Sequence, residues 1–209
     1  MLNFRATRFF SFLILVLTFS FKLTLAQSYY QNFDGADTSK YTSIKILFAK
    51  ESNNIWQIGK PHKHYFDSAY SKPNVLVTDT SKAYPVNDTS VFSFKLPVLG
   101  FHFSNFALQW VQKIDMSKGG DIGIMECSID LGKSWVNVFK SPYVYSVYGQ
   151  QVMMDMDTLK TGEIGFSGTD SLWRDIWICF NLYKAPTIDT LEFRFTFRSD
   201  SVNQHWKFK

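Results

Sequence analysis

The sequence predicts an all-β fold, a two-sheet antiparallel sandwich or jelly roll, and three observations support this prediction. Several segments carry a hydrophobic side chain at every second position, whereas no long stretch repeats with the period of a helix. Turn-forming residues separate these segments at short intervals. The 21 Phe, 10 Tyr and 6 Trp residues also favour strands over helices. Many short strands between turns are typical of sandwiches and jelly rolls.

The clearest strand pattern covers residues 191–198, where apolar and polar side chains alternate. The apolar side chains share one face of this strand and belong to Leu191, Phe193, Phe195 and Phe197. The other face carries Glu192, Arg194 and Arg198, which we expect to lie in water. The pattern therefore predicts an antiparallel strand with one buried face.

Shorter strand-like segments occupy much of the remaining chain: residues 75–78, 90–95, 106–112, 121–129, 135–139 and 173–182. Pro and Gly residues lie in several of the connections between them. The sequence shows no internal repeat, which argues against a propeller, because a propeller is built from several similar blades.

The first 26 residues have the pattern of a secretory signal peptide. Two arginines, Arg5 and Arg8, precede an apolar run over residues 9–21, and small residues follow it before Gln27. We expect cleavage before Gln27 and a single domain over residues 27–209 that is secreted or held at the cell surface. The apolar run is short and contains Ser and Thr, so we expect no membrane span after the signal is removed.

Removal of the signal leaves a nearly neutral chain. The whole sequence has 22 basic and 18 acidic residues, and Arg5, Arg8 and Lys22 of the basic residues belong to the signal. Subtracting these three leaves a net charge of +1. The domain therefore lacks the surplus of positive charge that is typical of proteins that bind nucleic acids.

The two cysteines, Cys127 and Cys179, each lie in an apolar strand-like segment. An exported chain permits a disulfide, which would join two sheets. Two buried thiols are the equal alternative, because a free cysteine packs as a small hydrophobic residue.

Residues 128–135, with the sequence SIDLGKSW, match the pattern Ser-x-Asp-x-Gly-x-Ser-Trp. This pattern is the Asp-box, which is known mostly from sialidase-type propellers. It lies here between two strand-like segments, so we expect the tip of a hairpin. Asp130 is suited to accept hydrogen bonds from backbone N–H groups of the turn, and Gly132 is suited to a positive φ.

The other fixed residues of the Asp-box also have turn-building roles. Ser128 and Ser134 are suited to local side-chain to backbone hydrogen bonds, and Trp135 to packing beneath the turn. We therefore interpret the motif as structural and assign it no catalytic residue.

Five segments resemble, in the same order, motifs of one family: NIWQIGKP at residues 54–61, FDSAYS at 66–71, MECSIDLGKSW at 125–135, GFSG at 165–168 and FRFTFRSD at 193–200. Together they resemble the MAM-like jelly roll of secreted and surface proteins of Bacteroidetes, akin to the cleaved adhesin domains of gingipain-type proteases. The resemblance implies a two-sheet antiparallel sandwich, export, and binding or adhesion rather than catalysis.

The same resemblance implies two departures and a cofactor. Cys127 stands where the family usually has an aromatic residue, and the family continues past the Ser-Asp pair with a strand that this chain lacks. Family members often carry calcium. Asp34 and Asp200 are the candidate calcium ligands, because both lie in predicted loops and Ca²⁺ takes 6–8 oxygen ligands. The alternative is structural, with Asp34 as a turn residue before Gly35 and Asp200 as the cap of a strand.

Three tyrosines follow Pro142 at Tyr143, Tyr145 and Tyr148. Exposed tyrosine rings are suited to stack on the faces of sugars, so these are the candidate ligand-binding residues. The alternative is that they close one end of the core.

No catalytic motif accompanies these features. Ser167 lies in Gly-Phe-Ser-Gly-Thr and therefore lacks the full Gly-x-Ser-x-Gly pattern of a nucleophile elbow. We predict a secreted, non-catalytic module that binds a glycan or a protein at the cell surface. The alternatives are a glycan-active hydrolase or lyase on a jelly-roll frame, and a structural remnant of a longer multidomain protein.

Overall fold

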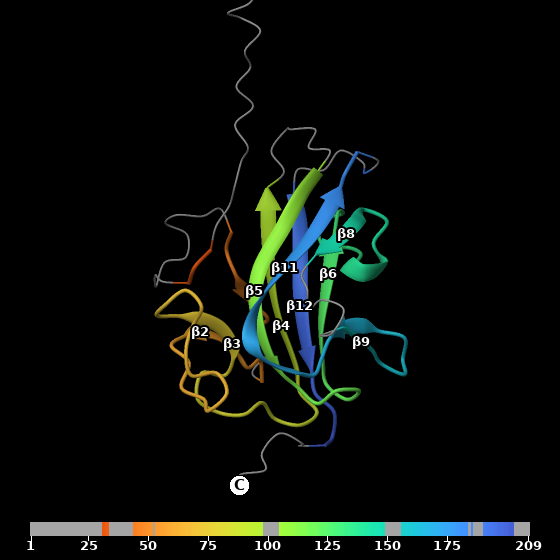
Figure 1. Cartoon of the computed structure of the whole chain (residues 1–209). Helices are drawn as coiled ribbons and strands as arrows, with labels where there is room; N and C mark the ends of the chain where they lie inside the picture. Colours follow the sequence, from red (N-terminus) through yellow and green to blue (C-terminus); the bar gives the residue numbers. More distant parts are fainter. Residues whose placement is uncertain are drawn as a thin grey trace, which may run out of the picture.

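A computed structural model describes residues 31–33, 44–51, 53–97, 105–148, 156–183, 185 and 190–202. Within these residues the chain forms strands and one short 3-10 helix, and every strand pairing is antiparallel (Figure 1). The prediction of an all-β fold is confirmed. Residues 1–26 and the candidate ligand Asp34 lie outside the described residues. In the described part of the chain, no helix has the length and apolar character needed to cross a membrane.

The larger sheet has seven strands in the order β1-β4-β12-β6-β10-β9, with β7 paired to β6. These strands are β1 (Leu47–Phe48), β4 (Thr89–Pro97), β6 (Ile122–Ser128), β7 (Val136–Asn137), β9 (Met156–Thr158), β10 (Ile164–Phe166) and β12 (Thr190–Arg198). Strand β12 lies between β4 and β6 and pairs with both along its length. It coincides with the alternating segment that the sequence marks most clearly.

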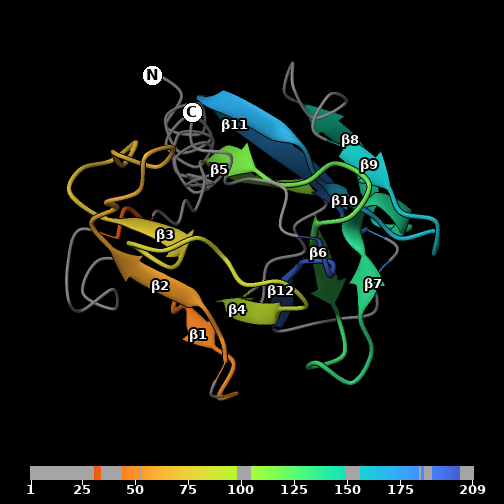
Figure 2. The same ribbon diagram turned by 90° about the horizontal axis from the view of Figure 1, so that it is seen from below.

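The smaller sheet has three strands in the order β5-β11-β8, and β2 and β3 form a separate pair. Their bounds are β2 (Trp56–Gly59), β3 (Val75–Thr78), β5 (Asn105–Asp115), β8 (Val144–Tyr148) and β11 (Thr169–Asn181). Seen from below, β3 lies between β2 and β5 (Figure 2). The β2–β3 hairpin therefore stands beside the long edge strand of the smaller sheet.

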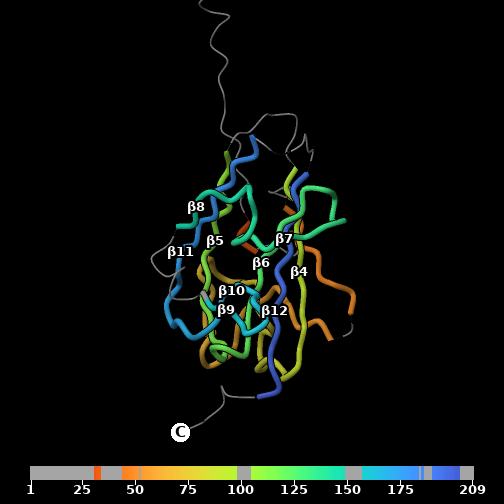
Figure 3. The backbone as a smooth tube through the Cα atoms, turned by 90° about the vertical axis from the view of Figure 1, so that its right-hand side faces the viewer, coloured from red at the N-terminus to blue at the C-terminus, as the bar shows by residue number. Residues whose placement is uncertain are grey.

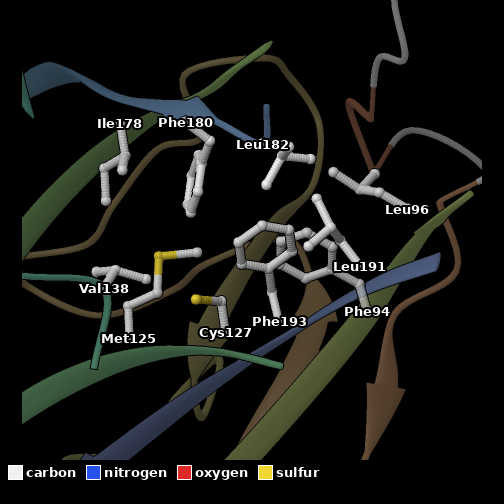
Figure 4. Packing of buried hydrophobic residues seen from close by; sticks show 10 residues of the cluster. All are labelled: Phe94, Leu96, Met125, Cys127, Val138, Ile178, Phe180, Leu182, Leu191 and Phe193. Atoms are coloured by element: carbon white, nitrogen blue, oxygen red, sulfur yellow. The ribbon is translucent and has the colours of Figure 1, made fainter. Parts of the chain in front are cut away.

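Hydrophobic side chains from both sheets meet in two clusters, and the larger one has ten buried members. Strands β4, β6 and β12 of the larger sheet and β11 of the smaller sheet contribute most of its buried members: Phe94, Leu96, Met125, Cys127, Ile178, Phe180, Leu191 and Phe193 (Figure 4). Phe180 and Phe193 meet edge to face with ring centroids 5.5 Å apart, which joins the two sheets. The two layers are therefore stacked face to face as in a β-sandwich (Figure 3).

The predicted strand segments correspond to β3, β4, β5, β6, β7 and β11. The segment over residues 135–139 forms less strand than expected, because β7 ends at Asn137 and a 3-10 helix, η1 (Val138–Lys140), follows. The Asn137 side chain accepts a hydrogen bond from the backbone N–H of Phe139 at 2.9 Å and so caps this helix.

Glu192 departs from the expectation that it would lie in water. Only 7 % of this residue is exposed. Its carboxylate forms an ion pair with the Lys95 ammonium at 2.7 Å. The cover comes from the turn over residues 128–135, since a Cβ added at Gly132 would lie 3.3 Å from a Glu192 carboxylate oxygen. The turn bends over the outer face of the larger sheet, which a pattern of alternation along one strand does not reveal.

Both cysteines are buried free thiols. Cys127 belongs to the cluster between the sheets (Figure 4). Cys179 lies on β11 between Ile178 and Phe180, which point into that same cluster, so its side chain faces the opposite, outer side of the smaller sheet. The structure therefore contains two buried thiols rather than a disulfide between Cys127 and Cys179.

Candidate functional site

The Asp-box forms the turn between β6 and β7, as predicted. The hairpin is defined by the antiparallel pairs Glu126↔Asn137 and Cys127↔Val136. Gly132 has a φ of 80°, a left-handed conformation that glycine adopts without steric cost. Leu131, with a φ of 62°, shares this conformation, which the motif does not anticipate.

The polar groups of the Asp-box bind one another. The Asp130 carboxylate accepts hydrogen bonds from the Ser128 hydroxyl at 2.8 Å, the Ser134 N–H at 2.8 Å and the Ser134 hydroxyl at 2.6 Å. These bonds to Ser134 and Ser128 lower the pKa of Asp130 to about 2. The Trp135 indole N–H donates to the Gly132 carbonyl at 3.1 Å. A carboxylate held this way is charged and occupied, so it is suited to fixing a turn and unsuited to donating a proton.

A different surface carries exposed aromatic side chains: the outer side of the smaller sheet. Along β11, Ile176, Ile178 and Phe180 are buried between the sheets. The alternate residues Asp175 and Trp177 therefore face outward, and 37 % of Trp177 is exposed. The long β11 strand thus separates a buried apolar side from an accessible side.

Strand β8 adds two tyrosines to this accessible side. Tyr145 is 59 % exposed and Tyr148 is 57 % exposed. Tyr148 lies directly opposite Trp177 in the β8–β11 pairing, where side chains on one face of a sheet are in contact range. Partial desolvation, with contributions from the neighbouring Cys179 and Tyr148, raises the pKa of Tyr145. We name the surface formed by Tyr145, Tyr148 and Trp177 the aromatic face.

Asp175 holds the aromatic face in position. Its carboxylate accepts a hydrogen bond from the Trp177 indole N–H at 2.7 Å. The same carboxylate accepts two hydrogen bonds from the Gln109 amide of β5, at 2.9 and 3.1 Å. Asp175 thus fixes an exposed tryptophan ring and links it to the adjacent strand. The aromatic face therefore combines exposed rings with the polar groups of Asp175 and Gln109 beside them.

The predicted tyrosines divide between two environments. Tyr145 and Tyr148 lie on the aromatic face, whereas Tyr143 is partly buried and packs against the core cluster. Sequence reasoning missed Trp177, Asp175 and Gln109. Reading residues 173–182 for a period of two would have placed Asp175 and Trp177 on one side. Nothing local indicates Gln109, which lies across from Trp177 only because β5 pairs with β11.

The candidate calcium ligand Asp200 has structural contacts. One of its carboxylate oxygens accepts a hydrogen bond from the Val202 N–H at 2.7 Å. Its own N–H donates to the buried Asp121 at 2.9 Å. Asp121 also accepts hydrogen bonds from the Tyr84 hydroxyl at 2.6 Å and the Ser117 N–H at 3.0 Å. Across the described residues, no three His, Cys, Asp or Glu side chains are grouped as a metal site.

A charged groove of about 460 Å³ crosses the outer side of the larger sheet. It contains two carboxylates, Glu126 and Glu163, and each binds an arginine of β12. The Arg194–Glu126 pair is 2.6 Å long, and the Arg194 guanidinium also lies 4.4 Å from the centre of the Trp135 ring. Burial alone would raise the pKa of Glu163, but hydrogen bonds from Arg198 and Thr161 outweigh it and lower that pKa.

No known protein family, curated protein or solved structure matches this chain. The aromatic face and the charged groove are therefore the features of this chain from which a function can be inferred.

Proposed function

We propose that this protein is a secreted or surface-exposed binding module that recognises glycans through its aromatic face. The observation that carries the proposal is the exposure of Tyr145, Tyr148 and Trp177 on one side of one sheet. In the same proposal the sandwich is a jelly roll of the MAM-like kind, as the sequence resemblance implies. The stacked antiparallel sheets support this reading at the level of a β-sandwich.

The physical basis is stacking combined with hydrogen bonding. The face of a pyranose ring presents C–H groups, which pack on the electron-rich face of an aromatic ring. The ring edge presents hydroxyls, which need polar partners beside the stacking rings. Asp175 and Gln109 lie beside Trp177 and supply carboxylate and amide groups there. Because strand pairing fixes the spacing of the rings, little conformational entropy is lost when a sugar binds.

Binding is preferred to glycan hydrolysis because of the state of the charged groove. Both of its carboxylates are held in ion pairs with arginines of β12. The general acid of a glycosidase has a raised pKa. Glu163 has a lowered pKa instead. These features support a surface held by ion pairs rather than an acid–base pair.

The test is a binding screen of the purified chain against soluble polysaccharides and mucin glycans, read by affinity electrophoresis and calorimetry. Alanine replacements at Tyr148 and Trp177 should each weaken binding by about tenfold or more, because each removes a stacking surface. Tyr183→Ala is the matched control, since Tyr183 is 81 % exposed but follows β11 and lies outside the aromatic face. Its affinity should equal that of the native chain.

Two results would overturn the proposal. One is a folded native chain that binds none of the glycans. The other is a glycan affinity that Trp177→Ala and Tyr183→Ala leave equally unchanged. Repeating the screen with a chelator tests the calcium prediction separately, since only a calcium-dependent site loses affinity when the ion is removed.

A further inference from the structure

A cleft of about 940 Å³ opens between the two sheets and is lined by β3 and β5. Figure 2 shows these two strands near each other. Every residue of β3, Val75–Thr78, and every residue of β5, Asn105–Asp115, lines it. Successive residues of a strand point to opposite faces of the sheet, so a space that touches all of them runs along the edge of the strand. We name this space the edge slot.

The two strands that bound the edge slot each have an edge outside the described ladders. In the described part of the chain, β5 pairs only with β11, and β3 pairs only with β2. Every second residue of an antiparallel edge strand directs its N–H and C=O groups away from its neighbour. Such a row of backbone groups is a template for another strand.

The direction of the β3 groups follows from one hydrogen bond. The Asp79 N–H, directly after β3, donates to the Ile55 carbonyl at 2.7 Å, so this N–H faces the β2 side. Bonded pairs alternate along the ladder, which turns the backbone groups of Thr78 and Leu76 away from β2. The buried Lys63 ammonium, whose pKa burial lowers to about 8, donates to the Thr78 carbonyl. Leu76 remains as the central outward-facing residue of this edge.

The floor of the edge slot is apolar. Aromatic side chains of the larger sheet form it, among them Phe92, Phe94 and Phe195. Polar side chains also line the edge slot, and one of them is unusual: the Gln112 side-chain nitrogen is buried and has no hydrogen-bond partner. Its side-chain oxygen accepts from the Trp110 indole at 2.9 Å. An acceptor on a molecule bound in the edge slot would satisfy this donor.

We propose that the edge slot receives an extended strand of a partner protein. The strand pairs with the β5 edge through its backbone and places apolar side chains, at every second position, against the aromatic floor. A peptide backbone supplies both donors and acceptors in register, whereas a lipid acyl chain of similar bulk satisfies neither edge. The proposal is independent of glycan recognition, although Gln109, Asp175 and Trp177 border both sites.

The experiment measures amide hydrogen exchange of the full chain with and without a defined peptide. The probe has eight residues in which valine alternates with threonine, with an added lysine at each end for solubility. At saturation, exchange of the outward-facing amides of β5 should slow by at least tenfold. Amides of β6 are the internal reference, because β6 is paired on both sides and its exchange should not change.

Two matched peptides and two matched variants sharpen the test. The first peptide is N-methylated on its β5-facing amides and therefore cannot donate backbone hydrogen bonds to β5. The second has the same composition without alternation and therefore has no apolar face. Neither peptide should slow amide exchange in β5. Leu108→Glu puts a charge into the edge slot and should abolish protection, whereas Val136→Glu puts one on exposed β7 and should not. Native exchange in β12 verifies that each variant is folded.

Four outcomes overturn the proposal. The first is no binding of the alternating peptide to the folded chain. The second is equal binding of the N-methylated peptide, which would make the slot a site for apolar ligands. The third is β5 protection that is present without peptide and disappears when residues 203–209 are removed, which would make the occupant part of the same chain. The fourth is a dimer in sedimentation with β5 already protected, which would make it a second copy.

Discussion

The outer sides of the two sheets use exposed polar and aromatic groups in opposite ways. On the larger sheet, the polar groups of the Asp-box turn bind one another, and the glutamates on the same side of the sheet bind Lys95, Arg194 and Arg198. On the smaller sheet, one carboxylate, Asp175, holds an exposed indole ring in place. On the side with the recognisable motif the polar groups therefore bind one another, whereas the side without one exposes aromatic rings to solvent. A recognisable sequence pattern can therefore mark a turn whose polar groups bind one another rather than a binding site.

The largest expected effect removes the support that both sides share. Phe193→Ala deletes a fully buried ring at the contact between the sheets and should lower the free energy of unfolding by about 3–5 kcal/mol. Denaturant titration followed by circular dichroism measures the change. A loss below about 1 kcal/mol would mean that the sheets do not depend on this contact, and the two sides could not then be compared as faces of one sandwich.

The next largest effect is expected from Gly132→Ala, which should lower stability through the outer side of the larger sheet without changing glycan binding. Gly132→Ala forces a side chain into a left-handed conformation and toward the Glu192 carboxylate, so we expect a loss of about 1–2 kcal/mol. Glycan affinity should stay within twofold of the native value, because the turn lies on the other sheet. Thermal unfolding and calorimetry on the same samples give both numbers. A variant of native stability that loses glycan binding would reverse the assignment of the two sides.

A smaller effect is expected from Asp175→Ala, and it should appear in binding. The variant leaves the Trp177 ring and removes the carboxylate that orients it, so glycan affinity should fall about fivefold, equivalent to about 1 kcal/mol. The midpoint of thermal unfolding should change little, since the bonds lie on an exposed surface. Asp175→Asn keeps an acceptor for the indole and should restore part of the affinity. Equal affinities in all three chains would show that Trp177 needs no positioning.

The smallest effect concerns acid. The pKa of Asp130 is lowered from 3.8 to about 2 in the folded chain, so its contribution to stability is complete above about pH 4 and is lost as the pH falls toward 2. In Asp130→Asn this residue no longer titrates. The native unfolding midpoint should therefore fall more steeply than that of the variant between pH 4 and pH 2. Parallel curves for the two chains would contradict the turn hydrogen bonds assigned to this carboxylate.

The local sequence pattern predicts the strands of this fold better than it predicts which side chains on those strands are buried. Alternation over residues 191–198 identifies β12, because side-chain period is a property of a single strand. The burial of Glu192 escapes the same pattern, since it depends on a turn some sixty residues earlier in the chain bending over β12. At Glu192, therefore, the local sequence pattern predicts the strand correctly but not the burial of the side chain.

The candidate site follows the same division. Tyr145 and Tyr148 could be proposed from the sequence, because a tyrosine-rich segment after a proline is visible without a partner strand. Trp177 can be identified as part of the candidate site only because it lies opposite Tyr148 in the β8–β11 pairing. Gln109 can be identified only because β5 pairs with β11. These are long-range pairings that neither composition nor spacing specifies. The opposite orientations of the two cysteines have the same origin, since they depend on which face each strand turns to the core.

Those orientations have a consequence for where the chain can be made and can function. With Cys127 inside the sandwich and Cys179 on its far side, no covalent bridge contributes to the stability of the native state. The fold is therefore indifferent to the redox potential of its surroundings, and a strong reductant should leave its melting temperature unchanged. Production of the chain with and without an oxidative folding machinery should therefore yield the same folded molecule.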